Sequence, residues 1–225
     1  AENTVEDEPV DTGDPPGECE DRVEGVVINE LMANPSGSDD DAEWIELYHA
    51  GSDPADLTGW GVQSGTQDFG GTDVFDGSPV MQPGDYLVVG GANVPGVDLV
   101  IDFSLGNATS SLDGVRLVDC AESPVDTVIY GEQEVGDTGV PVDDPWVDDS
   151  GEVATSFAPK PAEGASVGRA PDGADTDQSG DDFIRLDFAT PGASNTDIPP
   201  CEGQDDVRIN EFLAAAGCHA TNWDE

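Results

Sequence analysis

Basic residues are scarce in this sequence. Of its 225 residues only 6 are Lys or Arg, against 50 Asp or Glu, so the formal net charge is −44 at pH 7. Lys and Arg are the residues that hold phosphate backbones and draw proteins to anionic membrane surfaces. We therefore expect no nucleic acid among the partners of this chain and no docking on an anionic membrane.

Long apolar runs and helical periodicity are missing as well. The longest apolar runs, such as Tyr86 to Val89, are far shorter than the roughly 18 residues that a membrane span requires. No segment keeps apolar residues at positions i, i+3, i+4 and i+7, and 28 Gly and 17 Pro interrupt the chain. We expect no membrane insertion and no long helix, but short strands joined by many turns.

The acidic excess has two interpretations. A dense carboxylate surface stays hydrated in a high-salt environment, where screening shortens the reach of each charge. Asp-rich loops also hold Ca²⁺, a hard cation that takes carboxylate and carbonyl oxygens as ligands. The composition favours neither interpretation over the other, and the two are compatible.

Apolar segments of strand length recur between clusters of Gly, Asp and Pro. Short strands at this spacing predict an all-β fold, a two-sheet β-sandwich. The expected strands are 26–32, 43–48, 85–89, 98–103, 114–119, 125–130, 165–169 and 183–188, with a further apolar stretch at 57–60.

One stretch of the sequence occurs twice. Ile28-Asn29-Glu30 lies in an apolar segment near the start, and the same three residues return as Ile209-Asn210-Glu211 near the end. A repeat of this kind indicates a second copy of one structural unit. The predicted organisation is an acidic linker or tail at 1–24, a sandwich at 25–196, a linker at 197–206 and the first strand of a second, truncated copy at 207–225.

An ordered series of motifs resembles the lamin-tail domain family. The series runs through 28–32, 43–48, 56–60, 83–89, 114–117, 125–131, 166–169 and 190–195. The resemblance implies an immunoglobulin-like β-sandwich with long acidic loops over most of residues 26–195, of the type found in bacterial and archaeal extracellular proteins. The sequence departs from the family at His49, where Asn is usual, and in an acidic stretch, 132–163, that we interpret as an expanded loop.

The resemblance also implies a function without catalysis, since lamin-tail domains are modules that tether, scaffold or accompany enzymes. Our first hypothesis is a secreted, noncatalytic structural, adhesion or assembly module. It would form one unit of a tandem array on the cell surface or in a surface filament, with other copies of itself as protein partner. The alternatives are an accessory domain of a secreted hydrolase, such as a nuclease, and a calcium-binding surface module.

The clearest metal candidate is an acidic loop late in the sequence. Asp175, Asp177 and Ser179 alternate before a glycine, as in the first half of an EF-hand loop, although Leu186 stands where a bidentate Glu would close the loop. The predicted Ca²⁺ ligands are Asp172, Asp175, Asp177, Ser179, Asp181 and Asp182. A second acidic candidate consists of Asp39, Asp40, Asp41 and Glu43.

Two arrangements that imitate catalytic sites have simpler structural interpretations. Ser166 lies in a G-x-S-x-G pattern, but no apolar strand precedes it and no helix is expected after it, so we predict a strand residue. Glu30 and Glu46 fall in strand segments, and we expect them to accept hydrogen bonds that fix the sandwich rather than to act as a glycosidase-like pair. Trp146, in the acidic stretch, is a candidate for an exposed contact.

The four cysteines favour an oxidising, extracellular compartment, and the lack of a C-x-x-C spacing argues against a zinc ribbon. Because Cys19 and Cys201 each stand just before a copy of the repeat, we favour a Cys19–Cys120 disulfide. Cys120–Cys201 and Cys201–Cys218 remain alternatives.

The second copy also suggests a route to assembly. A strand without its own sheet can pair with a sheet edge of a neighbouring molecule, which joins molecules head to tail. The residues predicted to form this assembly strand are Val207, Ile209, Glu211 and Leu213.

Overall fold

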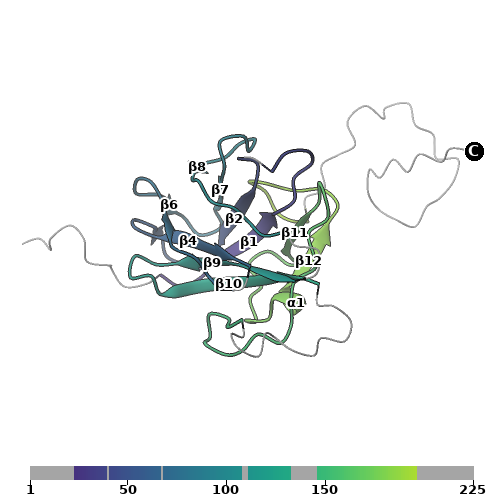
Figure 1. Cartoon of the computed structure of the whole chain (residues 1–225). Helices are drawn as coiled ribbons and strands as arrows, with labels where there is room; N and C mark the ends of the chain where they lie inside the picture. The colour runs from purple at the N-terminus through teal and green to yellow at the C-terminus, as the bar shows by residue number, and fades with distance from the viewer. Residues whose placement is uncertain (1–22, 40, 67, 108–110, 133–145, 197–225) are drawn as a thin grey trace, which may run out of the picture.

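A computed structural model of the chain describes residues 23–39, 41–66, 68–107, 111–132 and 146–196 (Figure 1). Apart from one short helix, α1 (Ser179–Asp182), the elements in these ranges are β-strands. In the same ranges no helix has the length and apolar character needed to cross a membrane. The predicted linker and assembly strand, 197–225, lie outside the described residues.

The strands form two main sheets. The larger sheet has the order β12-β11-β1-β2-β7-β8, and the smaller has the order β10-β9-β4-β5. Neighbouring strands are antiparallel except β7 and β8. The larger sheet contains β1 (Val26–Met32), β2 (Trp44–His49), β7 (Tyr86–Gly90), β8 (Leu99–Val100), β11 (Ser166–Arg169) and β12 (Phe183–Leu186). The smaller contains β4 (Gly61–Gly65), β5 (Asp73–Val74), β9 (Leu112–Val118) and β10 (Pro124–Gly131), and β3 (Ala55–Asp56) pairs with β6 (Val80–Met81).

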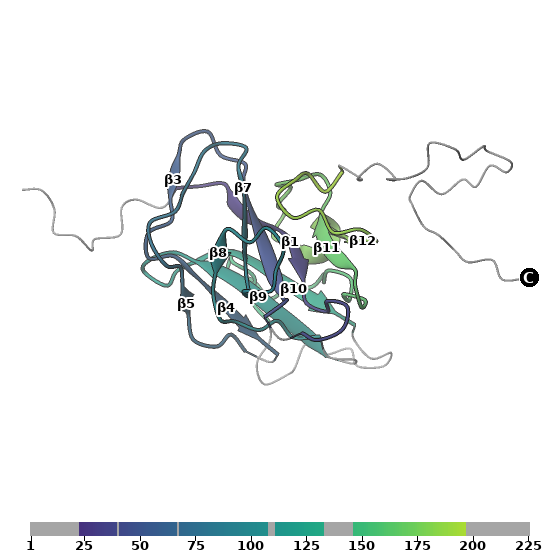
Figure 2. The same ribbon diagram turned by 90° about the horizontal axis from the view of Figure 1, so that it is seen from above.

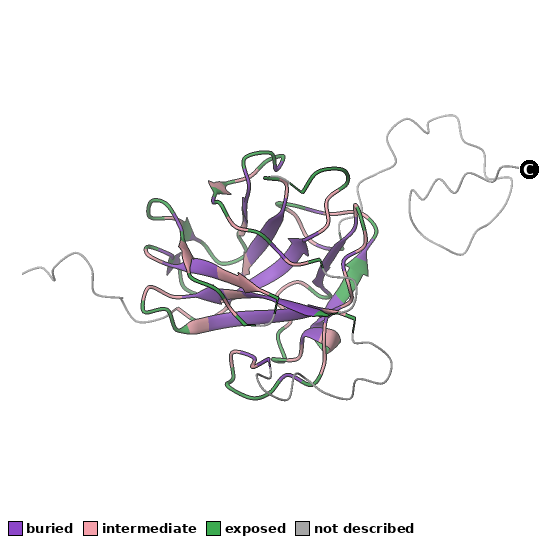
Figure 3. Ribbon diagram, in the orientation of Figure 1, coloured by how far each residue is buried: buried purple, intermediate pink, exposed green. Residues whose placement is uncertain are grey.

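The two sheets lie one above the other (Figure 1), and Figure 2 gives the same ribbon from above. The main core lies between the two sheets. On β2, Ile45 and Leu47 are fully buried in this core, because alternate side chains of a strand point to the same face. Trp44 points to the opposite face and packs with Met32 and Val88 in a second apolar cluster. Both faces of the larger sheet are therefore covered near β1 and β2, whose residues are buried except Tyr48 and are mostly purple in the burial colouring (Figure 3).

Most of the predicted strands are confirmed, with boundaries shifted by one or two residues. The segment expected at 98–103 keeps only the two residues of β8, and the apolar stretch at 57–60 forms a turn before β4. β4 itself was not predicted, because Val62 is its single apolar residue and the pattern therefore lacks alternation. The all-β, immunoglobulin-like sandwich follows from the strands that were predicted.

The expected exposure of Trp146 is wrong. Its side chain is only 3% exposed and packs against Leu112, Ile129 and Ala154 on the outer face of the smaller sheet. The ring of Phe69 meets it edge-on at 5.0 Å between centroids. The described part of the acidic stretch therefore adds a small third layer to the sandwich, because Trp146 and Ala154 are buried against Leu112 and Ile129, whereas Val153 stays exposed.

A β-bulge interrupts the pairing of β1 with β2. Ile28 pairs with Leu47 and Glu30 pairs with Glu46, so Asn29 is the extra residue of β1. A bulge changes the direction in which neighbouring side chains point. At this position it brings the side chains of Asn29 and Glu30 to the same polar region beside Glu46.

Candidate functional site

Four polar side chains on the outer face of the larger sheet form a cluster that we name the clamp. The clamp consists of Asn29, Glu30, Glu46 and Asp172. The first two come from the bulge in β1, the third from β2, and the last from the loop after β11. Residues 187–196, which follow β12 and which we name the strap, lie against the clamp.

Each clamp carboxylate accepts hydrogen bonds from the strap. Glu30 accepts from the Thr190 N–H at 3.1 Å and from the Thr190 hydroxyl at 3.0 Å. Glu46 accepts from the Gly192 N–H at 2.6 Å. Asp172 accepts from the Asn195 N–H at 3.0 Å and from the Ser194 hydroxyl at 2.5 Å. The clamp thus binds backbone and side-chain donors along the whole turn of the strap.

Further hydrogen bonds fix the clamp itself. The Asn29 side-chain amide donates to Glu46 at 3.1 Å and to Asp172 at 3.0 Å. Ser166 donates its hydroxyl to Glu30 at 2.5 Å. This serine is the first residue of β11, which confirms the prediction that it is a strand residue. The expectation that Glu30 and Glu46 accept structural hydrogen bonds is also confirmed.

Burial changes the acidity of the clamp. Desolvation raises the pKa of Glu46 to about 8, against the opposing effect of hydrogen bonds from Asn29 and Gly192. Desolvation likewise raises the pKa of Glu30, and the hydrogen bond from Ser166 offsets part of this rise. At Asp172, burial acts to raise the pKa, but hydrogen bonds from Ser194 and Asn195 outweigh it and lower the pKa below its ordinary value.

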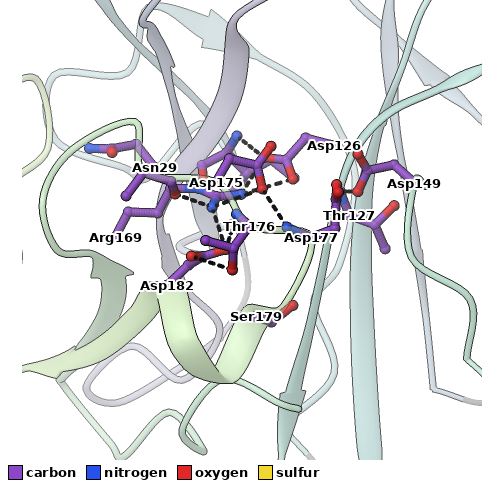
Figure 4. A network of polar contacts seen from close by, with 12 residues as sticks. Asn29, Asp126, Thr127, Asp149, Arg169, Asp175, Thr176, Asp177, Ser179 and Asp182 are labelled. Atoms are coloured by element: carbon purple, nitrogen blue, oxygen red, sulfur yellow. Dashed lines mark hydrogen bonds and ion pairs between the residues drawn. The ribbon is translucent and has the colours of Figure 1, made fainter. Parts of the chain in front are cut away.

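A second polar cluster centres on Arg169, which is 1% exposed (Figure 4). Its guanidinium donates from Nη2 to both oxygens of Asp126 at 2.9 Å and from Nη1 to Asp182 at 3.1 Å. Asp175 forms a longer ion pair at 3.3 Å. Burial alone would lower the pKa of Arg169, but these carboxylates, Asp126 first among them, raise it, so the arginine is charged.

The carboxylates that converge within the described residues are not the predicted set. Carboxylate oxygens of Asp126, Asp149 and Asp175 lie within 4.8 Å of one another. Asp149 also accepts a hydrogen bond from the Thr127 N–H at 3.1 Å. Burial, together with repulsion from Asp126, raises the pKa of Asp149 to about 7. These three residues are the group whose geometry suits a cation.

The predicted Ca²⁺ ligands are distributed over several places. Asp172 belongs to the clamp, while Asp175 and Asp182 bind Arg169. Ser179 is buried in α1 and its hydroxyl accepts the Ile129 N–H at 3.0 Å. The side chains of Asp177 and Asp181 are exposed, so of the six predicted ligands only Asp175 takes part in the converging group.

The second acidic candidate has a partly structural role as well. Glu43 accepts the Leu105 N–H at 2.9 Å, and burial raises the pKa of this carboxyl to about 7. Asp39 accepts a hydrogen bond from the Asn107 amide at 3.3 Å. The structure describes Asp41 but not Asp40, and Asp41 is not among the carboxylates that converge.

His49, the departure from the family pattern, is fully buried at the end of β2. Its Nε2 lies 2.5 Å from the carbonyl oxygen of Asp53 and its Nδ1 accepts the Gly51 N–H at 3.3 Å. The imidazole therefore organises the turn that follows β2. Cys120 is half-buried against the main core, and its predicted partner Cys19 lies outside the described residues, so that disulfide stays a prediction.

Sequence reasoning missed Asp126, Asp149 and Arg169 as a group. They come from β10, from the acidic stretch and from β11, far apart in the sequence. One signal in the sequence was available. Only 6 residues are Lys or Arg, and an arginine within a strand segment, such as Arg169, needs acidic partners if it is buried.

The two packed, mainly antiparallel sheets define the class of the protein, a β-sandwich of immunoglobulin type. Residues 21–132 match the family model of the Lamin Tail Domain, and this match supports placing the domain in that family. No curated protein matches the chain. β11, β12 and the strap lie beyond the matched residues, yet they complete the larger sheet and bind the clamp.

Proposed function

We propose that this domain is a noncatalytic, extracellular structural module, one unit of a tandem array whose partners are further copies of the same module. The observation that carries the proposal is the repeat of Asn29-Glu30 as Asn210-Glu211. In the described copy these two residues hold the end of the domain in place through the strap. A second pair in the same sequence context supports a second copy of the same module.

The chemistry of the buried polar groups also supports a structural role. Glu30 and Glu46 are fully buried, and both oxygens of each accept hydrogen bonds from the protein. Ser166 donates to Glu30, and His49 binds the turn after β2. Groups engaged in this way stabilise the fold and offer no open position to a substrate.

The experiment is to follow the purified chain by sedimentation velocity and electron microscopy over a wide concentration range. The proposal expects ordered, concentration-dependent assembly, and a chain that stays monomeric at every concentration contradicts it. Reading the gene on either side of these residues separates the alternatives. Further Ile-Asn-Glu copies support the array, whereas a nuclease or protease motif supports an accessory domain of a secreted hydrolase.

Calcium binding is a second candidate function, favoured by the convergence of Asp126, Asp149 and Asp175. Three carboxylates with a single arginine beside them leave an excess of negative charge that a hard cation would neutralise. Titration calorimetry with Ca²⁺ tests this, with Asp149→Asn as the site variant and Asp181→Asn as the exposed control. Binding that only Asp149→Asn abolishes supports the site. The absence of heat, and a melting temperature equal in Ca²⁺ and in EDTA, contradicts it.

A further inference from the structure

The strap is attached to the sandwich mainly through polar contacts. Pro191 and Gly192 are exposed, while Thr190 and Asn195 are buried against the clamp. The apolar contribution is small, since Ala189 alone from the strap packs against the cluster that contains Trp44. The strap is therefore recognised by its hydrogen-bond donors rather than by a large apolar surface.

The match between strap and clamp is specific in its chemistry. The strap presents backbone N–H groups at Thr190, Gly192 and Asn195, together with hydroxyl groups. The clamp provides the matching acceptors, since its carboxylates accept hydrogen bonds at both oxygens. Asn195 adds two bonds in the same region, donating its side-chain amide to the carbonyl oxygens of Asn29 and Arg169 at 3.0 and 2.9 Å. A segment with a different spacing of donors would leave buried carboxylates without partners.

The connection between the strap and the rest of the domain allows the strap to leave as a unit. It begins at Asp187, an exposed residue directly after β12, whose side chain forms an ion pair with the similarly exposed Arg185 at 3.3 Å. No strand of the described sandwich follows the strap, so its departure would leave the order of both sheets unchanged. When identical chains exchange such an element, each contact between strap and clamp is kept, and only the high effective concentration of the tethered segment is lost.

We propose that the clamp also accepts the strap of a second copy of this chain, so that strap exchange joins copies to one another. This inference rests on the proposed assembly function and names the contact that carries it. The partner is a turn with the sequence Thr-Pro-Gly-Ala-Ser-Asn, here 190–195, and the receiving site is the clamp. Within one chain the tethered strap occupies its own clamp. A second Asn-Glu pair, Asn210-Glu211, follows the strap closely in the same sequence, as expected for consecutive units of an array.

Complementation between two full-length variants tests the proposal. Glu30→Gln keeps the strap but turns an amide N–H toward the Thr190 donors, which disables the clamp. Thr190→Val keeps the clamp but removes the hydroxyl donor of the strap. In neither variant can the strap form all of its hydrogen bonds with the clamp of the same chain. In a mixture, the intact strap of Glu30→Gln can bind the intact clamp of Thr190→Val. We expect the dimer fraction of an equimolar mixture, measured by sedimentation velocity, to exceed that of either variant alone at least tenfold.

The control chain is Glu211→Gln, which makes the same change in the second Asn-Glu pair. Mixed with Thr190→Val, it is expected to form no more dimer than the unaltered chain does, because its clamp already holds its own strap. Should Glu30→Gln fail to fold, Asp172→Asn disables the clamp at the Ser194 and Asn195 contacts and replaces it in the mixture.

Hydrogen exchange at the Gly192 amide, which donates to Glu46, measures whether the strap is released from its own clamp. With this measurement each outcome either supports or overturns strap exchange. Faster exchange in each single variant together with a monomeric mixture overturns strap exchange. Unchanged exchange in the single variants also overturns it, because the clamp bonds would then not be what holds the strap. If the unaltered chain assembles while the mixture stays monomeric, the array proposal survives and strap exchange does not.

Discussion

Arg169 on β11 and Asp126 on β10 join the two sheets of the sandwich through a buried ion pair at 2.9 Å. Both residues also bind the backbone of Ile28 on β1. The Arg169 Nε donates to the Ile28 carbonyl at 2.8 Å, and Asp126 accepts the Ile28 N–H at 2.6 Å. The pair therefore supplies partners for backbone groups beside the bulge, at the point where the ladder between β1 and β2 is interrupted.

Replacing Arg169 by Met is expected to destabilise the domain by about 3–5 kcal/mol, because it leaves Asp126 and Asp182 buried without a cation. Urea unfolding followed by tryptophan fluorescence measures the loss. Arg185→Met is the matched control, since Arg185 pairs with Asp187 at the surface and such pairs contribute about 0–1 kcal/mol. Equal losses for the two variants would show that the buried pair has no special role.

The pKa of Asp149 makes stability depend on pH. Its pKa is raised to about 7 in the folded protein, above the ordinary value of 3.8, so between these values the folded state binds more protons than the unfolded state. The free energy of unfolding therefore falls as pH rises from about 4 to about 7 and levels off above that. We expect Asp149→Asn to make this fall in the free energy of unfolding smaller by an amount on the order of 1 kcal/mol between the two pH values. This figure allows for the screening of a half-buried carboxylate by solvent.

Thermal unfolding between pH 4 and pH 9 measures this effect. Glu43→Gln is a second test, because the pKa of Glu43 is raised to about 7 by burial and its ionisation acts in the same direction. Asp181→Asn, at an exposed position, serves as the control and is expected to leave the slope as it is. A slope that survives in both site variants would assign the pH dependence to other groups.

Trp146→Ala is expected to cost about 3–5 kcal/mol of stability, the usual range for removing a buried aromatic ring. The loss includes the edge-on contact with Phe69 and the covering of Ile129 on the outer face of the smaller sheet. Chemical denaturation gives the value. Val153→Ala, in the same stretch but 44% exposed, is the control with little expected change. A small loss at Trp146 would mean that the third layer contributes little to folding.

The strands could be predicted because their apolar residues alternate, and Ile45 and Leu47 on β2 occupy the core as this pattern requires. The bulge at Asn29 could not be read from the sequence, since it depends on register against β2. The same holds for the buried ion pair of Arg169, whose partner Asp126 is distant in sequence. Trp146 was placed wrongly because its acidic neighbours suggested a solvated loop, although one aromatic ring is enough to anchor such a loop.

The disulfide prediction is open to a direct measurement. Cys120 follows β9 and packs half-buried against the main core, so a bond from this position would tie an incoming segment to the body of the sandwich. Peptide mapping under reducing and nonreducing conditions is expected to show Cys19 linked to Cys120. A cross-link closing a loop of about 100 residues stabilises by about 4–5 kcal/mol in the chain-entropy model, so reduction should lower the melting temperature clearly. A Cys120–Cys201 peptide in the map would instead rule out one disulfide per copy. The bond would then join the predicted linker before the second copy, 197–206, to the first domain.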